Sequence, residues 1–147
     1  MDLVICTQPQ ADHMAGLVEV LQRYKVKQAL ESGVSCNSSI CQEWHRLIED
    51  KGIEYNMAQA GQEIDLGSGI KLEVLNPPES LWKETSDDVN NNGVVLRLSW
   101  GRISFLFTAD IREDVEFELI GQRANLESTV LKMTPTQPTH LALQLQA

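Results

Sequence analysis

The chain has 147 residues, of which 42% are hydrophobic and 22% charged. This is the composition of an ordinary globular protein, at a length that suggests one domain. No apolar run approaches the ~20 residues of a membrane span, and the N-terminus lacks the basic region of a signal peptide. The 21 acidic and 12 basic side chains give a net charge of −9, so the isolated chain is not expected to bind nucleic acid.

The first half of the chain alternates strand and helix patterns. Residues 2–6 (DLVIC) form a short apolar run, which predicts a buried strand. Residues 13–24 place apolar side chains at helical spacing. A second strand is expected over residues 27–30 and a second helix over residues 39–52. This alternation is typical of a parallel sheet covered by helices.

The second half predicts two hairpins, then a helix and a strand. Gly-Ser-Gly and Gly-Arg separate strand-like segments, as hairpin turns do. The expected elements are strands at 62–66, 70–75, 94–100, 103–109 and 128–133, and a helix at 110–121. Residues 76–93 form a long polar loop, and the alternating end of the tail could add an edge strand. The fold class is therefore α/β (α+β), with either two sheets or one mixed sheet and helices outside.

The chain contains three cysteines, Cys6, Cys36 and Cys41. Three cysteines cannot all pair with one another, and their spacing matches no zinc motif. We expect reduced, partly buried thiols, which fits a cytosolic setting. A disulfide between Cys36 and Cys41 is not expected.

The loop after the first strand, TQPQADH at residues 7–13, is the candidate site. Side chains at i and i+2 of an extended segment point the same way, and here these are Gln8 and Gln10. Asp12 and His13 follow at the start of the helix. A His-x-His-x-Asp-His run in this place would bind two metal ions, and imidazole with carboxylate suits zinc or manganese. Glutamine is a weak, neutral substitute for imidazole.

These residues resemble a known family. TQPQADHMAGL is similar to the xHPxADHxxGL signature of the metallo-β-lactamase superfamily. With GQEIDLGSGIKLEVLNPP, DDVNNNGVVLRLSWGRISFLFTADI and STVLKM, it resembles the metallo-hydrolase-like domain of ComEC-type DNA-internalisation competence proteins, from residue 2 to about residue 135. The resemblance implies a partial αββα sandwich with mixed sheets and outer helices. Residues 1–147 would then be a single, incomplete domain of this type.

The resemblance assigns roles residue by residue. Asp12 and His13 match the pair that serves the second metal, and Asp110 matches the acid that bridges both ions. Gln8 and Gln10 stand where the first metal's ligands would be, and TPTQ follows residue 133 where the family has His-His-Gly. The implied metal site is therefore vestigial or holds a single ion. No cofactor is expected, except zinc or manganese if the residual site is occupied.

Each of these residues also has a purely structural interpretation. Asp12 could cap the first helix, and His13 could be an ordinary surface residue. Asp110 with Glu113 forms a capping-box pattern, as do Ser39 and Gln42 at the second helix. His45 and His140 are expected in solvent. Asn90–Asn92 are expected to be turn residues before a strand, with a packing role as the alternative.

The sequence thus favours a catalytically degenerate metallo-β-lactamase-like domain related to DNA-uptake competence proteins, with a structural or binding role. The alternative is a metal-dependent phosphodiesterase or nuclease, in which Asp12, His13 and Asp110 hold one ion; an unrelated interaction module is also open. A partial sandwich would expose apolar sheet, so self-association or a larger parent chain is expected. A freestanding chain would be cytoplasmic. A fragment of a competence channel protein would lie on the extracytoplasmic face of the membrane.

Overall fold

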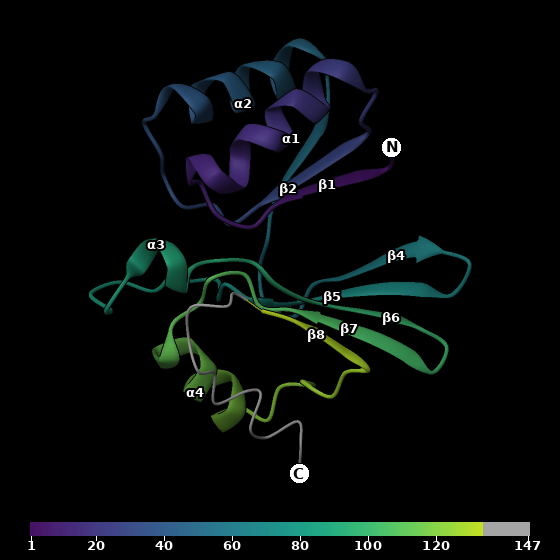
Figure 1. Ribbon diagram of the computed structural model, residues 1–147, viewed down its shortest axis with the longest axis vertical. Coiled ribbons are helices and arrows are strands. Elements are labelled where there is room, and N and C mark those ends of the chain that lie inside the picture. The colour runs from purple at the N-terminus through teal and green to yellow at the C-terminus, as the bar shows by residue number, and fades with distance from the viewer. Residues whose placement is uncertain (134–147) are drawn as a thin grey trace. The chain divides into compact units, whose positions relative to one another are not determined.

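The computed structural model describes residues 1–133, and the chain divides into two units, Met1–Ala58 and Gln59–Ala147 (Figure 1). No helix within residues 1–133 is long and apolar enough to span a membrane. The predicted edge strand of the tail and His140 lie outside the described residues. The two units have different architectures and are described separately.

The N-terminal unit is a parallel sheet with two helices on one face. Its elements are β1 (Leu3–Cys6), α1 (Ala11–Arg23), β2 (Gln28–Glu31), α2 (Ser39–Asp50) and β3 (Glu54–Met57). The strands pair in the order β1-β2-β3, all parallel. Figure 1 shows α1 and α2 side by side over the same face of this sheet. The predicted parallel sheet with covering helices is therefore confirmed.

The core of this unit lies between the helices and the sheet. Met14, Leu21 and Trp44 are fully buried and pack with side chains from β1 and β2. The strand β3 was not predicted, because three of its four residues are exposed. An edge strand with so little apolar surface has no hydrophobic alternation that would reveal it.

The C-terminal unit is a five-stranded mixed sheet. Its elements are β4 (Glu63–Gly67), β5 (Ile70–Asn76), α3 (Asp88–Asn91), β6 (Val95–Trp100), β7 (Ile103–Phe107), α4 (Glu113–Gly121) and β8 (Val130–Lys132). The strands lie in sequence order, β4 to β8. Neighbours from β4 to β7 are antiparallel, and β8 is parallel to β7. Helix α4 lies against one face (Figure 1), where Val115 and Leu119 pack on Val95 and Leu106 of the sheet.

Both predicted hairpins are present. The β4–β5 turn has a positive φ at three successive residues, Gly67, Ser68 and Gly69. The β6–β7 turn has one at Gly101. Glycine adopts this conformation without the steric cost that other residues incur, which is why the Gly-Ser-Gly and Gly-Arg segments marked the turns correctly.

Helix starts were predicted less accurately. Ser38, not Ser39, caps α2, by accepting a hydrogen bond from the Cys41 N–H at 3.4 Å. Helix α4 begins at Glu113, with Arg112 as its N-cap and no side-chain cap hydrogen bond. The capping box of Asp110 and Glu113 is therefore wrong, because residues 108–112 form a loop in which Ala109 has φ 50°.

Candidate functional site

The loop between β1 and α1, residues 7–10, is called here the glutamine loop. Gln8 Nε2 donates a hydrogen bond to Gln10 Oε1 at 2.7 Å, and the Gln10 N–H donates to the Gln8 carbonyl at 2.9 Å. The Gln8 side chain is fully buried. The prediction that these two side chains lie together is confirmed, and they meet as an amide pair.

Asp12 and His13 lie in the first turn of α1. Asp12 does not cap the helix, because the N-cap is Gln10. The Asp12 carboxylate lies 3.5 Å from His13 Nε2, and His13 Nδ1 lies 3.4 Å from the Thr7 hydroxyl. A carboxylate in the first turn also interacts favourably with the helix dipole. The imidazole is thus held between the helix start and the end of β1.

Asp110 lies in the other unit, in the loop between β7 and α4. This loop is anchored at Arg112, whose backbone N–H donates to Asn91 Oδ1 at 2.8 Å. The Arg112 guanidinium also donates to Asp87 Oδ2 at 3.0 Å. Asp110 is partly buried. The structure therefore brings Asp12 and His13 together and places Asp110 in a separate, well-anchored loop.

The anchor belongs to a network of asparagines around α3. Asn91 Nδ2 donates to Thr85 Oγ1 at 2.9 Å and to Asp114 Oδ2 at 3.2 Å. Asn76 Nδ2 donates to the backbone carbonyls of Asn91 and Gly93 at 2.9 and 2.7 Å. Because buried amides need such partners, the Asn90–Asn92 run has a packing role rather than only a turn role.

Asn92 joins α3 to the long polar loop. Its Oδ1 accepts from the Trp82 N–H at 2.8 Å, and its Nδ2 donates to the Trp82 carbonyl at 2.9 Å. The Trp82 indole N–H in turn donates to Asn76 Oδ1 at 3.0 Å. Residues 76–93 are therefore fixed by side-chain amides along the loop, although the sequence suggested only an irregular connection.

Hydrogen-bond donors lower the pKa values of two carboxylates in this network. Burial raises the pKa of Asp87, but hydrogen bonds from the Asn90 backbone and the Arg112 guanidinium outweigh it, so the net shift is downward. Hydrogen bonds from the Ser86 hydroxyl and backbone N–H lower the pKa of Asp114. The folded loop therefore favours ionised carboxylates at both positions.

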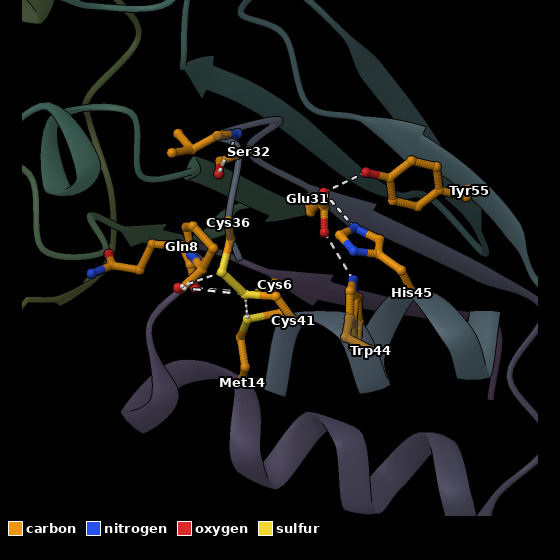
Figure 2. A network of polar contacts seen from close by, with 12 residues as sticks. Cys6, Gln8, Met14, Glu31, Ser32, Cys36, Cys41, Trp44, His45 and Tyr55 are labelled. Carbon is orange, nitrogen blue, oxygen red and sulfur yellow. Dashed lines mark hydrogen bonds and ion pairs between the residues drawn. A yellow bond between two sulfur atoms is a disulfide. The ribbon is translucent and has the colours of Figure 1, made fainter. Parts of the chain in front are cut away.

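A second polar cluster, centred on Glu31, was missed by sequence reasoning (Figure 2). Glu31 ends β2, and its carboxylate is nearly buried. It accepts hydrogen bonds from Trp44 Nε1 at 2.8 Å, from His45 Nε2 at 3.2 Å and from the Tyr55 hydroxyl. Burial, followed by the neighbouring Glu31 carboxylate, raises the pKa of Tyr55. The sequence signal that could have revealed this cluster is an acidic residue directly after the apolar residues of a strand.

His45 was expected in solvent, and about half of its side chain is exposed. Its ring nevertheless contacts Glu31 and lies edge-on to Tyr55, with ring centroids 5.8 Å apart. Every polar atom in this cluster comes from β2, α2 or β3. The cluster therefore ties the helix layer to the sheet within the N-terminal unit.

The cysteines differ from the prediction. Cys36 and Cys41 form a disulfide, with Cα atoms 6.1 Å apart, because the loop before α2 folds back over the first turn of the helix. This separation is within the usual range for a disulfide. Cys6 is free and buried, and burial raises its thiol pKa to about 12. The expectation of three reduced thiols is wrong for Cys36 and Cys41.

The donor set does not fit the two-metal site that the resemblance implies. Within residues 1–133, no three His, Cys, Asp or Glu side chains are grouped so that they could hold a metal ion. At the positions of the first metal's ligands, Gln8 and Gln10 offer neutral amides that bond to each other. Metal binding by Asp12, His13 and Asp110 stays a prediction.

No protein-family model and no curated protein matches the sequence. Among solved structures, CmlA, a diiron β-hydroxylase from Streptomyces venezuelae, is similar with a TM-score of 0.54 and 15% identity over 89% of this chain and 24% of CmlA. YhfI, a metallo-β-lactamase fold protein from Bacillus subtilis, gives a TM-score of 0.48 and 14% identity over 93% of this chain and 52% of YhfI. The chain shares the fold of the part of CmlA that it covers. It spans about a quarter of CmlA and half of YhfI.

The parallel sheet and the mixed sheet, each with helices, agree with the predicted α/β (α+β) fold class. At 14–15% identity these likenesses concern the fold alone. What the chain does has to be argued from its own residues.

Proposed function

We propose that this chain is a catalytically degenerate metallo-β-lactamase-like domain with a structural or binding role. The observation that carries the proposal is the amide pair of the glutamine loop, Gln8 Nε2 to Gln10 Oε1 at 2.7 Å. This pair occupies the positions at which the family resemblance calls for metal ligands.

The chemistry of the pair supports this conclusion. A zinc ligand must offer a lone pair from an imidazole, a thiolate or a carboxylate. The Gln8 nitrogen is an amide donor with no such lone pair, and the Gln10 oxygen already accepts the Gln8 hydrogen bond. Two-metal hydrolysis needs both ions to stabilise the attacking and the leaving oxygen, so a chain without the first set of ligands is not expected to catalyse it.

A relation to DNA-uptake competence proteins is the finer part of the proposal. It is supported by the sequence resemblance of the segment NNNGVVLRLSWGRISFLFTADI. Within this segment, Asn91 Oδ1 accepts the Arg112 N–H of the loop that carries Asp110, so this part of the motif serves the scaffold. A scaffold that keeps its loop anchors without the first metal's ligands suits a binding or structural role.

Metal analysis of the purified full chain tests the proposal. We expect substoichiometric zinc and manganese in the wild type, and no change in metal content in His13→Ala. The double variant Gln8→His/Gln10→His restores imidazole at both positions, and we expect it to bind more zinc than a matched Gln59→His/Gln62→His control.

The hydrolase alternative makes the opposite prediction. Stoichiometric zinc or manganese in the wild type that is lost in His13→Ala would overturn the degenerate assignment. So would hydrolysis of bis(p-nitrophenyl) phosphate by the wild type that is abolished in Asp110→Asn.

A further inference from the structure

The Cys36–Cys41 disulfide lies where the loop before α2 meets the glutamine loop. Cys36 belongs to the β2–α2 loop, residues 32–38, and Cys41 is the third residue of α2. Both sulfurs lie near the Pro9 carbonyl oxygen, at 3.5 Å for Cys36 and 3.8 Å for Cys41. The disulfide therefore ties the β2–α2 loop to the first turn of α2, next to the glutamine loop.

The two sulfurs differ in access. Cys36 is partly exposed, whereas Cys41 is fully buried, with its sulfur 3.4 Å from the Met14 sulfur. An incoming thiolate must approach a disulfide sulfur to react with it. Attack is therefore directed to Cys36, with Cys41 as the leaving sulfur.

Burial disfavours a thiolate at Cys41, and two neighbouring features act against this cost. The Ser38 hydroxyl lies 3.1 Å from the Cys41 sulfur and 3.3 Å from the Cys36 sulfur. Cys41 also sits in the first turn of α2, and helix N-termini stabilise thiolates. A leaving thiol with a lower pKa leaves faster.

We propose that Cys36–Cys41 is a reversible thiol–disulfide exchange site that takes a dithiol as its reductant, and that its oxidation state controls the β2–α2 loop. One thiolate of the dithiol attacks Cys36 Sγ, the Cys36–Cys41 bond breaks, and its electron pair leaves on Cys41 Sγ, which takes up a proton. The second thiol of the reductant, after losing its proton, attacks the mixed disulfide and releases Cys36. The dithiol is oxidised to a cyclic disulfide, and both cysteines become thiols.

The third cysteine is excluded from this exchange. Cys6 is buried, and its thiol donates to the Gln8 carbonyl oxygen at 3.3 Å. Desolvation raises its pKa to about 12, so it stays protonated and unreactive near neutral pH. Cys36 and Cys41 therefore form one two-electron redox pair, and the disulfide does not rearrange to include Cys6.

Reduction has a structural consequence for the loop. Two thiols cannot remain at bonding distance, so one sulfur must move away. Cys41 is fixed within α2 and buried, so Cys36 and its loop move. The Pro9 carbonyl oxygen can then accept a hydrogen bond from a cysteine thiol, which couples reduction of the disulfide to the glutamine loop. This inference is independent of the proposed function.

Alkylation of the native full chain tests the exchange site. The protein is incubated with dithiothreitol at neutral pH without denaturant, quenched with iodoacetamide and measured by intact mass spectrometry. We expect two alkylated cysteines, mapped to Cys36 and Cys41, and recovery of the disulfide on adding oxidised dithiothreitol. The Cys6→Ser variant should give the same two alkylated cysteines. A pair that is reduced only after denaturation, or a label on Cys6, would overturn the assignment.

Hydrogen exchange tests the coupling to the loop. Peptides covering residues 32–38 should exchange faster in the reduced protein, while the β4–β5 hairpin, residues 63–76, should not change. The Cys36→Ser variant should match the reduced wild type with or without dithiothreitol. Equal exchange of residues 32–38 in both oxidation states would show that the disulfide does not control the loop.

Discussion

The two units bury polar side chains in different ways. The N-terminal unit contains, apart from the amide pair of Gln8 and Gln10, the buried carboxylate of Glu31, which receives hydrogen bonds from Trp44, His45 and Tyr55. In the C-terminal unit, the buried amides Asn76 and Asn91 bond to both backbone and side-chain groups, and a buried carboxylate, Glu116, lies in α4.

The difference determines where each unit is vulnerable. When one ionisable group satisfies several buried donors, its loss leaves all of them unpaired together. The bonds of Asn91 are only partly buried, whereas the bond from Trp44 to Glu31 is buried, so loss of Asn91 leaves its partners closer to water. We therefore expect single substitutions to affect the Glu31 cluster more strongly than the asparagine network.

The largest effect is expected for Glu31→Ala. The change removes three hydrogen bonds and leaves the Trp44 indole N–H buried without its acceptor, so we expect a loss of about 4 kcal/mol in the free energy of unfolding. Urea unfolding followed by hydrogen exchange in peptides from each unit measures it. Glu19→Ala, which breaks an exposed i,i+4 pair with Arg23, is the control and should cost less than about 0.5 kcal/mol. Equal losses in both variants would contradict a concentrated role for Glu31.

A smaller effect is expected for Asn91→Ala. This substitution removes two donated bonds, to Thr85 and Asp114, and the acceptor of the Arg112 backbone N–H. We expect a loss of about 2 kcal/mol, measured in the same way, with faster exchange in residues 108–112. Asn125→Ala, at an exposed position in the same unit, should be near neutral. If Asn91→Ala cost more than Glu31→Ala, the comparison between the units would be reversed.

The acid response tests the ionised carboxylates of the C-terminal unit. The pKa values of Asp87, Asp88 and Asp114 are lowered in the folded C-terminal unit. Carboxyls of this kind contribute stability above their unfolded pKa of about 3.9 and lose it as the pH falls through the lower folded pKa. We expect the unfolding free energy of the unit to fall between about pH 4 and pH 2.

The variant Asp87→Asn isolates this contribution. It should be less stable than the wild type at neutral pH and should show a shallower acid-induced decline, because one of the titrating groups has been removed. Glu49→Gln, at an exposed position of α2, is the control and should follow the wild-type curve. An unchanged decline in Asp87→Asn would mean that this carboxylate does not contribute.

The smallest effect is expected for Arg112→Ala. The guanidinium pairs with Asp87 at 3.0 Å, and both side chains are about one-third exposed. Partly exposed ion pairs contribute little, so we expect a loss of about 0.5–1 kcal/mol, reduced further in high salt. Arg102→Ala, in the exposed β6–β7 turn, should change nothing in comparison. A loss as large as that of Asn91→Ala would show that charge, rather than the amides, fixes the loop.

The elements of the fold could be predicted wherever apolar periodicity or turn chemistry was strong. Such patterns mark β1, the helices α1 and α2, and the β4–β5 and β6–β7 hairpins. The β3 strand and α3 could not be predicted, because β3 is mostly exposed and α3 is a single turn held by Asp87 and Asn91 side chains.

The candidate site was predictable only in its local part. Gln8 and Gln10 were predicted to point the same way along an extended segment; their side chains do meet, although residues 8–10 form a bend rather than an extended segment. The Glu31 cluster and the Cys36–Cys41 disulfide depend on how β2, its loop and α2 pack, and no local pattern encodes that packing. Asp110 was placed in a capping box because the sequence does not reveal the positive φ of Ala109.

The sequence-order arrangement of the C-terminal sheet also bears on how it forms. Strands β4 and β5, and strands β6 and β7, are joined by two-residue turns, and such hairpins close within about 1–10 μs. Strand β8 pairs with β7 only after the chain has passed through α4, with contacts such as Thr129 to Ser104 spanning 25 residues. The entropy of loop closure is lost before contacts between distant residues can add stability. We therefore expect the hairpins to assemble first and β8 to dock last.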